Sequence, residues 1–296
     1  MLHRLYYSIN LHVCISFVGG FPYRTSKCFE TRGDLRSYVF NTEYPPYNAI
    51  AFIKVTSRFG DTDGRKQQYM GTAFAVQDFH NRKFLLTAAH NICELDEEDN
   101  ALKSPDGTFQ IMSDISIIFG YNKYSQSLKA ESVELEPNDF VIHPKFNTGG
   151  DEFDIAIYEM SKLATSKLPK AYFRMDMQIT ADKLKWTQTF ISGYPKDVYN
   201  LPMADPRRPP GTMWGLSCKE VTIDGRYCCY VDATSAGNSG SPLYYQTYNE
   251  DNQCVSVVFA VHVGCSKVQN SNKGVMIRSE FFDKTAVIYC RNSSIV

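Results

Sequence analysis

Short runs of apolar and β-branched residues, separated by turns, recur along most of this 296-residue sequence. The run at 49–55, for example, is followed by a turn at 58–64 that is rich in glycine and aspartate. Strands of this length between such turns are typical of antiparallel barrels and sandwiches. The sequence therefore predicts an all-β fold, with strands expected at 49–55, 71–76, 83–87, 114–119, 140–143, 187–192, 215–222, 227–231, 242–245 and 255–263.

A loop between two of these runs, residues 232–243, brackets Ser239 with Gly237 and Gly240. Glycine permits positive φ and close backbone approach, so the loop can turn its amide groups toward one point. The N–H groups of Gly237 and Ser239 could then form an oxyanion hole. A Gly-x-Ser-Gly segment is common by itself, so a catalytic interpretation needs a base and an acid elsewhere in the chain.

Candidates for both are present. The apolar run 84–89 ends in His90, and Asp154 directly precedes Ile-Ala-Ile at 155–157. A serine hydroxyl needs a base to remove its proton, and imidazole titrates near neutrality. A carboxylate on the second ring nitrogen would orient that base. The sequence thus offers His90 as base, Asp154 as orienting acid and Ser239 as nucleophile.

Each candidate has a competitor nearby. Asp151 and Glu152 compete with Asp154, which is favoured because it directly precedes the apolar run. Ser241 competes with Ser239, which is favoured by the Gly-Asn pair before it. His143 precedes a proline at a strand end and is interpreted as structural.

The order His90, Asp154, Ser239 resembles that of the chymotrypsin-like serine peptidases. Segments around these residues, and those at 191–195, 212–214 and 261–264, are similar to the glutamyl endopeptidase-like branch of that superfamily. The resemblance covers about residues 44–290 and implies a trypsin-like peptidase domain of two six-stranded antiparallel β-barrels, at about 44–160 and 173–280. The active site would lie between the barrels. Apolar residues at mixed helical spacing also predict a short C-terminal helix at 279–291.

The resemblance also implies a preference for cleavage after glutamate and, less strongly, aspartate. Thr234 and His262 match the threonine and histidine that bind the substrate carboxylate in glutamyl endopeptidases. Val263 and Gly264 follow on the strand that would pair with substrate backbone, although bacterial members usually have tryptophan at the first of these positions. Ala233 stands where trypsin-like enzymes selecting Arg or Lys carry an acid. Asp232 lies one place away and could supply this acid, so selection of Arg or Lys stays open as an alternative. His262 has a second interpretation as a buried strand histidine.

The termini and cysteines suggest export. Residues 1–20 are predicted to form a secretory signal peptide, although Asn10 and His12 interrupt its apolar region. Residues 21–43 are predicted to form a pro-segment or an arm outside the core.

Removal of the signal peptide would remove one of the nine cysteines and leave an even number, which fits disulfides in a secreted protein. Cys93 is expected to form a disulfide with an unidentified partner. Asn238 replaces the aspartate that pairs with the new N-terminus in trypsin-like zymogens, so activation is expected to differ.

Several classes are disfavoured. The net charge of −1 gives no reason to expect a nucleic-acid partner, and no apolar run reaches the roughly 18 residues of a membrane span. The sequence has no zinc-ligand spacing, so neither a metal nor another cofactor is expected. The predicted protein is a monomeric serine endopeptidase acting on proteins or peptides. The alternatives are a broad-specificity trypsin-like peptidase and an inactive binding protein on a peptidase fold.

Overall fold

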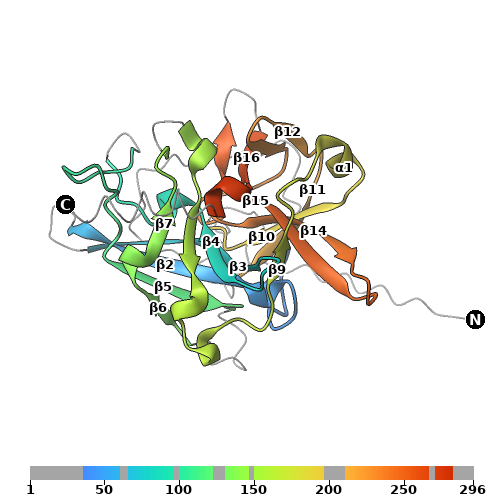
Figure 1. The fold of residues 1–296 in the computed structure, drawn as a ribbon, viewed down its shortest axis with the longest axis horizontal. Coiled ribbons are helices and arrows are strands. Elements are labelled where there is room, and N and C mark those ends of the chain that lie inside the picture. Colours follow the sequence, from blue (N-terminus) through green and yellow to red (C-terminus); the bar gives the residue numbers. More distant parts are fainter. Residues whose placement is uncertain are drawn as a thin grey trace, which may run out of the picture.

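The computed structural model describes residues 36–60, 66–96, 100–122, 131–146, 150–196, 211–266 and 271–282. Strands dominate these residues, with one short α-helix, α1 (Ala181–Lys185), and several 3₁₀ turns (Figure 1). The predicted all-β fold is confirmed. Within the described residues no helix is both long and apolar enough to cross a membrane.

The first half of the chain forms an antiparallel sheet in the spatial order β6-β5-β2-β3-β4-β8-β7. Strand β6 alternates, with Glu134 exposed between two buried apolar neighbours, as expected where one face of a sheet lies on the core. The strands are β2 (Ile50–Gly60), β3 (Lys66–Gln77), β4 (Lys83–Thr87), β5 (Asp114–Phe119), β6 (Val133–Leu135), β7 (Phe140–Ile142) and β8 (Ala156–Glu159).

The second half forms a similar sheet in the order β11-β10-β14-β15-β16-β13-β12. Its longest strand, β15, is fully buried from Val258 to Val261 and forms the centre of the second core. The strands are β10 (Thr189–Gly193), β11 (Trp214–Cys218), β12 (Thr222–Asp224), β13 (Tyr227–Tyr230), β14 (Pro242–Tyr248), β15 (Cys254–Ser266) and β16 (Ser271–Met276).

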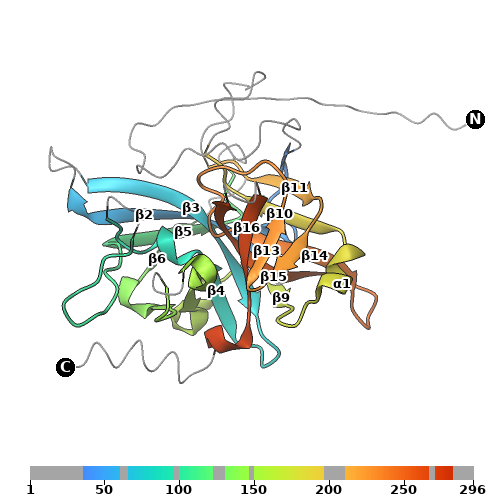
Figure 2. The same ribbon diagram turned by 90° about the horizontal axis from the view of Figure 1, so that it is seen from above.

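Strand β9 (Phe173–Met175) joins the two sheets, since it pairs in parallel with both β3 and β15. Phe173 is fully buried there and contacts Phe74 and Tyr244, with ring centroids 5.8 and 5.1 Å apart. Figure 2 shows β2, β3, β5 and β6 on one side and β10, β11, β14 and α1 on the other. β9 therefore links the two sheets, and the buried apolar residues form two separate cores.

The strand count differs from the prediction. Within the described residues each of the two sheets has seven strands rather than six. β6 and β8 in the first sheet and β12 and β16 in the second are additional to the strand ranges expected from the sequence. Among the described strands no pairing joins β6 to β7 or β11 to β12. Closure of each sheet into a barrel therefore stays a prediction.

Part of the N-terminal arm packs onto the second sheet. β1 (Ser37–Tyr38) pairs with β11, and the buried Val39 donates its N–H to the carbonyl of Met213 at 3.0 Å. Residues 1–35, which include the predicted signal peptide and most of the predicted pro-segment, lie outside the described residues.

At the other end, Ser279–Phe282 forms a 3₁₀ turn where a longer helix is predicted. The rest of that predicted helix, 283–291, also lies outside the described residues.

The predicted pairing of the eight cysteines is wrong for five of them. Cys93, Cys218, Cys228, Cys229 and Cys254 form no disulfide in the structure. Only Cys254 is exposed, and burial raises the pKa of the Cys93 thiol well above its ordinary value. Three of the buried four, Cys93, Cys218 and Cys228, pack as small apolar side chains in the two cores.

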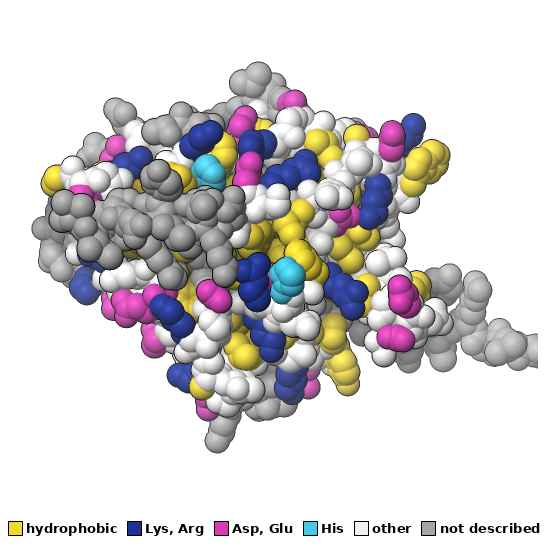
Figure 3. Space-filling view, in the orientation of Figure 1, with side chains coloured by type: hydrophobic (Ala, Val, Ile, Leu, Met, Phe, Trp, Pro, Cys, Tyr) yellow, Lys and Arg dark blue, Asp and Glu magenta, His cyan; other side chains and the backbone are white. Residues whose placement is uncertain are grey.

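Acidic and basic side chains are interspersed on the face drawn in Figure 3, in line with the net charge of −1.

Candidate active site

Two neighbouring strands bring His90 and Asp154 together. β4 and β8 are antiparallel, with Thr87 opposite Ala156. His90 follows the end of β4 on a one-turn 3₁₀ helix, Ala89–Asn91, and Asp154 precedes the start of β8. Because the strands run in opposite directions, both residues lie at the same end of the pair.

Asp154 contacts His90 at two points. Its Oδ2 lies 2.6 Å from His90 Nδ1, and its Oδ1 accepts the backbone N–H of His90 at 2.9 Å. Asp154 is 4% exposed and the His90 side chain 18%. A carboxylate only accepts hydrogen bonds, so Nδ1 carries the proton of the neutral ring and Nε2 is its proton-accepting atom.

The two competing acids point elsewhere. The Lys273 ammonium on β16 lies 2.7 Å from Asp151 Oδ2, and Arg226 Nε lies 3.7 Å from Glu152 Oε2. The Arg226 guanidinium also lies over the ring of Phe153, 4.7 Å from its centroid. These contacts hold the segment before Asp154 against the second half of the chain.

The loop that contains Ser239 depends on two glycines. Gly237 and Gly240 have φ values of +90° and +86°. A Cβ on Gly237 would lie 2.3 Å from the carbonyl oxygen of Tyr194, and one on Gly240 would lie 1.9 Å from that of Thr72. Both positions need glycine for its backbone freedom and for the absence of a side chain.

The first half of the chain clamps this loop. The Thr72 N–H and Asn91 Nδ2 both donate to the carbonyl oxygen of Ser239, at 2.9 and 2.8 Å. The Thr72 hydroxyl donates to the carbonyl of Gly237 at 2.8 Å. Within the described residues, the N–H groups of Gly237 and Ser239 donate to no protein acceptor. Among these residues, no hydrogen bond joins the Ser239 hydroxyl to His90 in this conformation.

His262 lies directly beside this loop. Its N–H donates to the carbonyl of Ser241, and its carbonyl accepts the N–H of Gly240, both at 2.8 Å. The residue is 2% exposed, and the Tyr230 hydroxyl lies 2.8 Å from Nδ1 of its ring. Burial, with a smaller effect from His90, lowers the pKa of His262 to about 3 despite a hydrogen bond with the Lys273 backbone. The ring is therefore neutral near neutral pH.

Thr234 is also buried and partnered. Its hydroxyl donates to Asn272 Oδ1 at 2.6 Å, and the Asn272 amide donates to the carbonyl of Asp232. The Asp232 carboxylate accepts the backbone N–H of Lys219 at 2.7 Å. Val263 and Gly264 follow on β15, where the register with β16 shifts between His262 and Gly264.

Comparisons with known proteins identify the fold. No protein-family model matches the chain, and no curated protein matches it. A solved Glu endopeptidase in complex with MPD superposes with a TM-score of 0.55 at 21% identity, covering 88% of this chain and 98% of that one. The thermostable serine protease AL20, from an extremophilic microorganism, gives 0.52 at 13% identity, covering 84% and 98%. The chain has the chymotrypsin-like serine peptidase fold.

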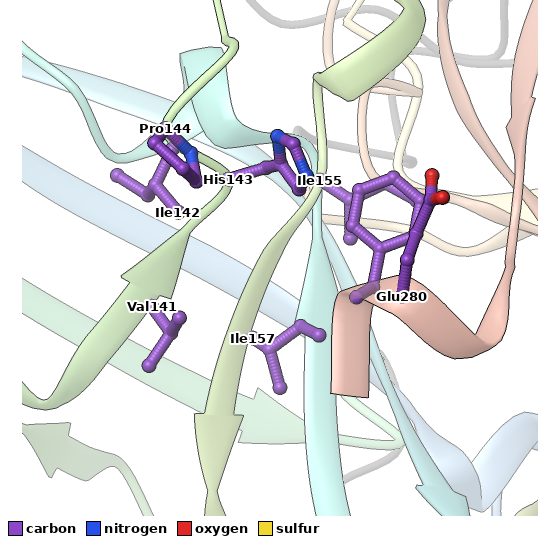
Figure 4. Close-up of a pocket in the computed structure, with 8 residues that line it drawn as sticks. Val141, Ile142, His143, Pro144, Ile155, Ile157 and Glu280 are labelled. Atoms are coloured by element: carbon purple, nitrogen blue, oxygen red, sulfur yellow. The ribbon is translucent and has the colours of Figure 1, made fainter. Parts of the chain in front are cut away.

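Another histidine of this chymotrypsin-like fold lies at a separate pocket. His143 stacks on Phe153, with ring centroids 4.2 Å apart, and its Nδ1 accepts the N–H of Lys145. Burial lowers the pKa of His143. Figure 4 shows His143 and Glu280 with the apolar residues that line this pocket. Its packing agrees with the structural interpretation of His143.

Three residues around the site were missed by the sequence analysis. Asn91, Tyr230 and Asn272 each bond to a predicted site residue or its backbone. Asn91 follows His90 directly, but nothing in the local sequence indicates that its amide reaches Ser239. The described residues contain no group of His, Cys, Asp and Glu side chains that could hold a metal ion.

Proposed function

We propose that the protein is a serine endopeptidase that uses Ser239, His90 and Asp154. The observation that supports this most directly is the two-point contact of Asp154 with His90, beside a glycine-bracketed Ser239 loop. The two structural neighbours are described as a Glu endopeptidase and a serine protease, which agrees with this activity.

In the proposed reaction the Ser239 hydroxyl oxygen attacks the carbonyl carbon of the peptide bond while His90 Nε2 takes its proton. The oxyanion that develops accepts hydrogen bonds from the N–H groups of Gly237 and Ser239. His90 then gives the proton to the leaving amine, which departs and leaves an acyl-enzyme that water hydrolyses. Asp154 keeps the ring in the correct tautomer and stabilises the imidazolium.

The triad is tested by replacement and labelling. Ser239→Ala and His90→Ala should each lower kcat by several orders of magnitude and should not add when combined, because residues that act as a unit are non-additive. A fluorophosphonate probe should label the wild-type protein at Ser239. Near-normal turnover in folded Ser239→Ala would remove this residue from the role. A folded wild-type protein that neither reacts with the probe nor cleaves peptides would favour the inactive binding protein.

We also propose that the enzyme prefers glutamate, and less strongly aspartate, on the acyl side of the cleaved bond. His262 is tied to the Ser239 loop by two backbone hydrogen bonds, and Thr234 precedes the nucleophile by five residues. The Asp232 carboxylate accepts the Lys219 N–H, which does not favour selection of Arg or Lys. A hydroxyl has one proton to donate, so Thr234 has to turn from Asn272 to bind a substrate carboxylate.

A peptide library tests this preference. Thr234→Val and His262→Ala should lower kcat/KM for glutamyl substrates by roughly tenfold to a hundredfold, because a hydrogen bond to a charged group contributes about 1.5–3 kcal/mol. The loss should be smaller for glutaminyl or leucyl substrates. Thr222→Val, at an exposed threonine on β12, is the matched control. Cleavage no better after Glu than after Gln, Leu or Lys would support the broad-specificity alternative.

A further inference from the structure

The carbonyl oxygen of Ser239 has two donors, and one is a side chain next to the proposed base. Asn91 Nδ2 donates to it at 2.8 Å across 148 residues of sequence, and the Thr72 N–H donates at 2.9 Å. Asn91 occupies the same one-turn 3₁₀ helix as His90. This helix therefore contacts Asp154 through His90 and the Ser239 loop through Asn91.

The orientation of the Asn91 amide is fixed by its surroundings. Nδ2 also donates to Thr87 Oγ1 at 3.0 Å, so both of its protons have acceptors. The Thr87 hydroxyl already donates its proton to the carbonyl of Thr72 at 2.7 Å and can only accept from Asn91. A flipped amide would place its oxygen against two acceptors, which excludes that orientation.

Space for this amide comes from Gly71. A Cβ at residue 71 would lie 2.7 Å from Asn91 Nδ2 and 3.0 Å from its Cγ and Oδ1. Gly71 does not have a positive φ, so its backbone conformation is one that alanine also adopts. The glycine is required here by the volume of the Asn91 side chain rather than by backbone geometry.

We propose that Asn91 is a positioning residue: its hydrogen bond to the Ser239 carbonyl fixes the position of the Ser239 backbone relative to His90. The Asn91 amide fits there because residue 71 is glycine and has no side chain. The proposal rests on the proposed peptidase function. The carbonyl that Asn91 binds belongs to Ser239 itself, so displacement of the amide shifts the residue that bears the nucleophile. A misplacement of about 1 Å in a catalytic group can cost roughly a hundredfold in rate.

A double-mutant cycle tests the pair. Asn91→Ala should slow fluorophosphonate labelling of Ser239 about tenfold to a hundredfold and lower kcat with little change in KM. Gly71→Ala removes no functional group but should cause a similar loss, because its Cβ displaces the amide. Added to Asn91→Ala, it should have almost no further effect, since the new methyl group enters vacated space.

Gly215→Ala is the matched control at another strand glycine. The atom nearest to a Cβ on residue 215 is the Ser192 hydroxyl, 3.1 Å away, so this variant should react with the probe at the wild-type rate. If Asn91→Ala does not fold, the labelling rates of Gly71→Ala and Gly215→Ala still test the proposal, because only Gly71→Ala should react slowly. Wild-type labelling by Asn91→Ala or Gly71→Ala, or equal effects of Gly71→Ala in both backgrounds, would overturn the proposal. A wild-type protein that the probe does not label would overturn the peptidase function itself.

Discussion

His262 is a buried histidine whose environment differs strongly from that of a free side chain in water. Its buried ring accepts a hydrogen bond from Tyr230, whose own pKa is raised well above the ordinary value by burial, so the phenol keeps its proton. The neutral imidazole has one ring N–H, which has to turn from the Lys273 backbone to donate a hydrogen bond to a substrate carboxylate. The proposed specificity would then not depend on protonation of His262 near neutral pH.

The lowered pKa of His262 predicts a pH dependence of stability. Below its ordinary value of 6.5, the unfolded chain binds a proton that the folded chain binds only near pH 3. Unfolding is therefore favoured progressively as the pH falls from about 6.5 toward 3. Urea titrations over this range should show a shallower loss in His262→Gln than in the wild type. His80→Gln, at an exposed histidine, should match the wild type, and an unchanged slope in His262→Gln would contradict the prediction.

At the scale of elements, the loop between β13 and β14 is shaped by what surrounds it as much as by its own residues. Gly240 and Gly107 have nearly the same φ, +86° and +84°, but Gly107 has open space where a Cβ would be. Comparison of the two separates backbone strain from steric fit.

Gly107→Ala should lower the free energy of unfolding by about 1–2 kcal/mol, the usual cost of a left-handed conformation with a Cβ. Gly240→Ala should cost more, because its methyl group would meet the Thr72 carbonyl and the Thr87 hydroxyl. It should also abolish labelling of Ser239, whereas Gly107→Ala should label normally. Chemical denaturation and probe kinetics measure the two effects, and equal losses in both variants would contradict this account.

At the scale of the whole molecule, contacts cross between the halves in both directions at the site. Thr72 and Asn91 of the first half bond to the Ser239 loop of the second. Lys273 and Arg226 of the second half pair with the acids just before Asp154 of the first. Together with β9, these contacts make the geometry of the site a property of the docked halves rather than of either sheet alone.

The sequence by itself determined the fold class, most strands and the segments that contain the candidate site. Apolar periodicity and turn residues are local signals, and they located strands such as β4 and β15 within a few residues. Among the strands that they missed are β9 and β16, because the first is only three residues long and the second begins Ser-Asn-Lys-Gly. Neither has a clear local pattern, and both form by pairing with distant strands.

Only the tertiary structure decided which side chains meet. The partners of Ser239, His262 and Thr234 lie 148, 32 and 38 residues away along the chain. The preference for Asp154 over its neighbours came from the sequence, but the pairing of those neighbours with Lys273 and Arg226 required the docked sheets. The even cysteine count suggested disulfides, yet five of the cysteines form none, because pairing needs close, correctly aimed Cβ atoms that composition cannot specify. Local pattern specifies elements, whereas hydrogen bonds, volume and burial between distant elements specify the site.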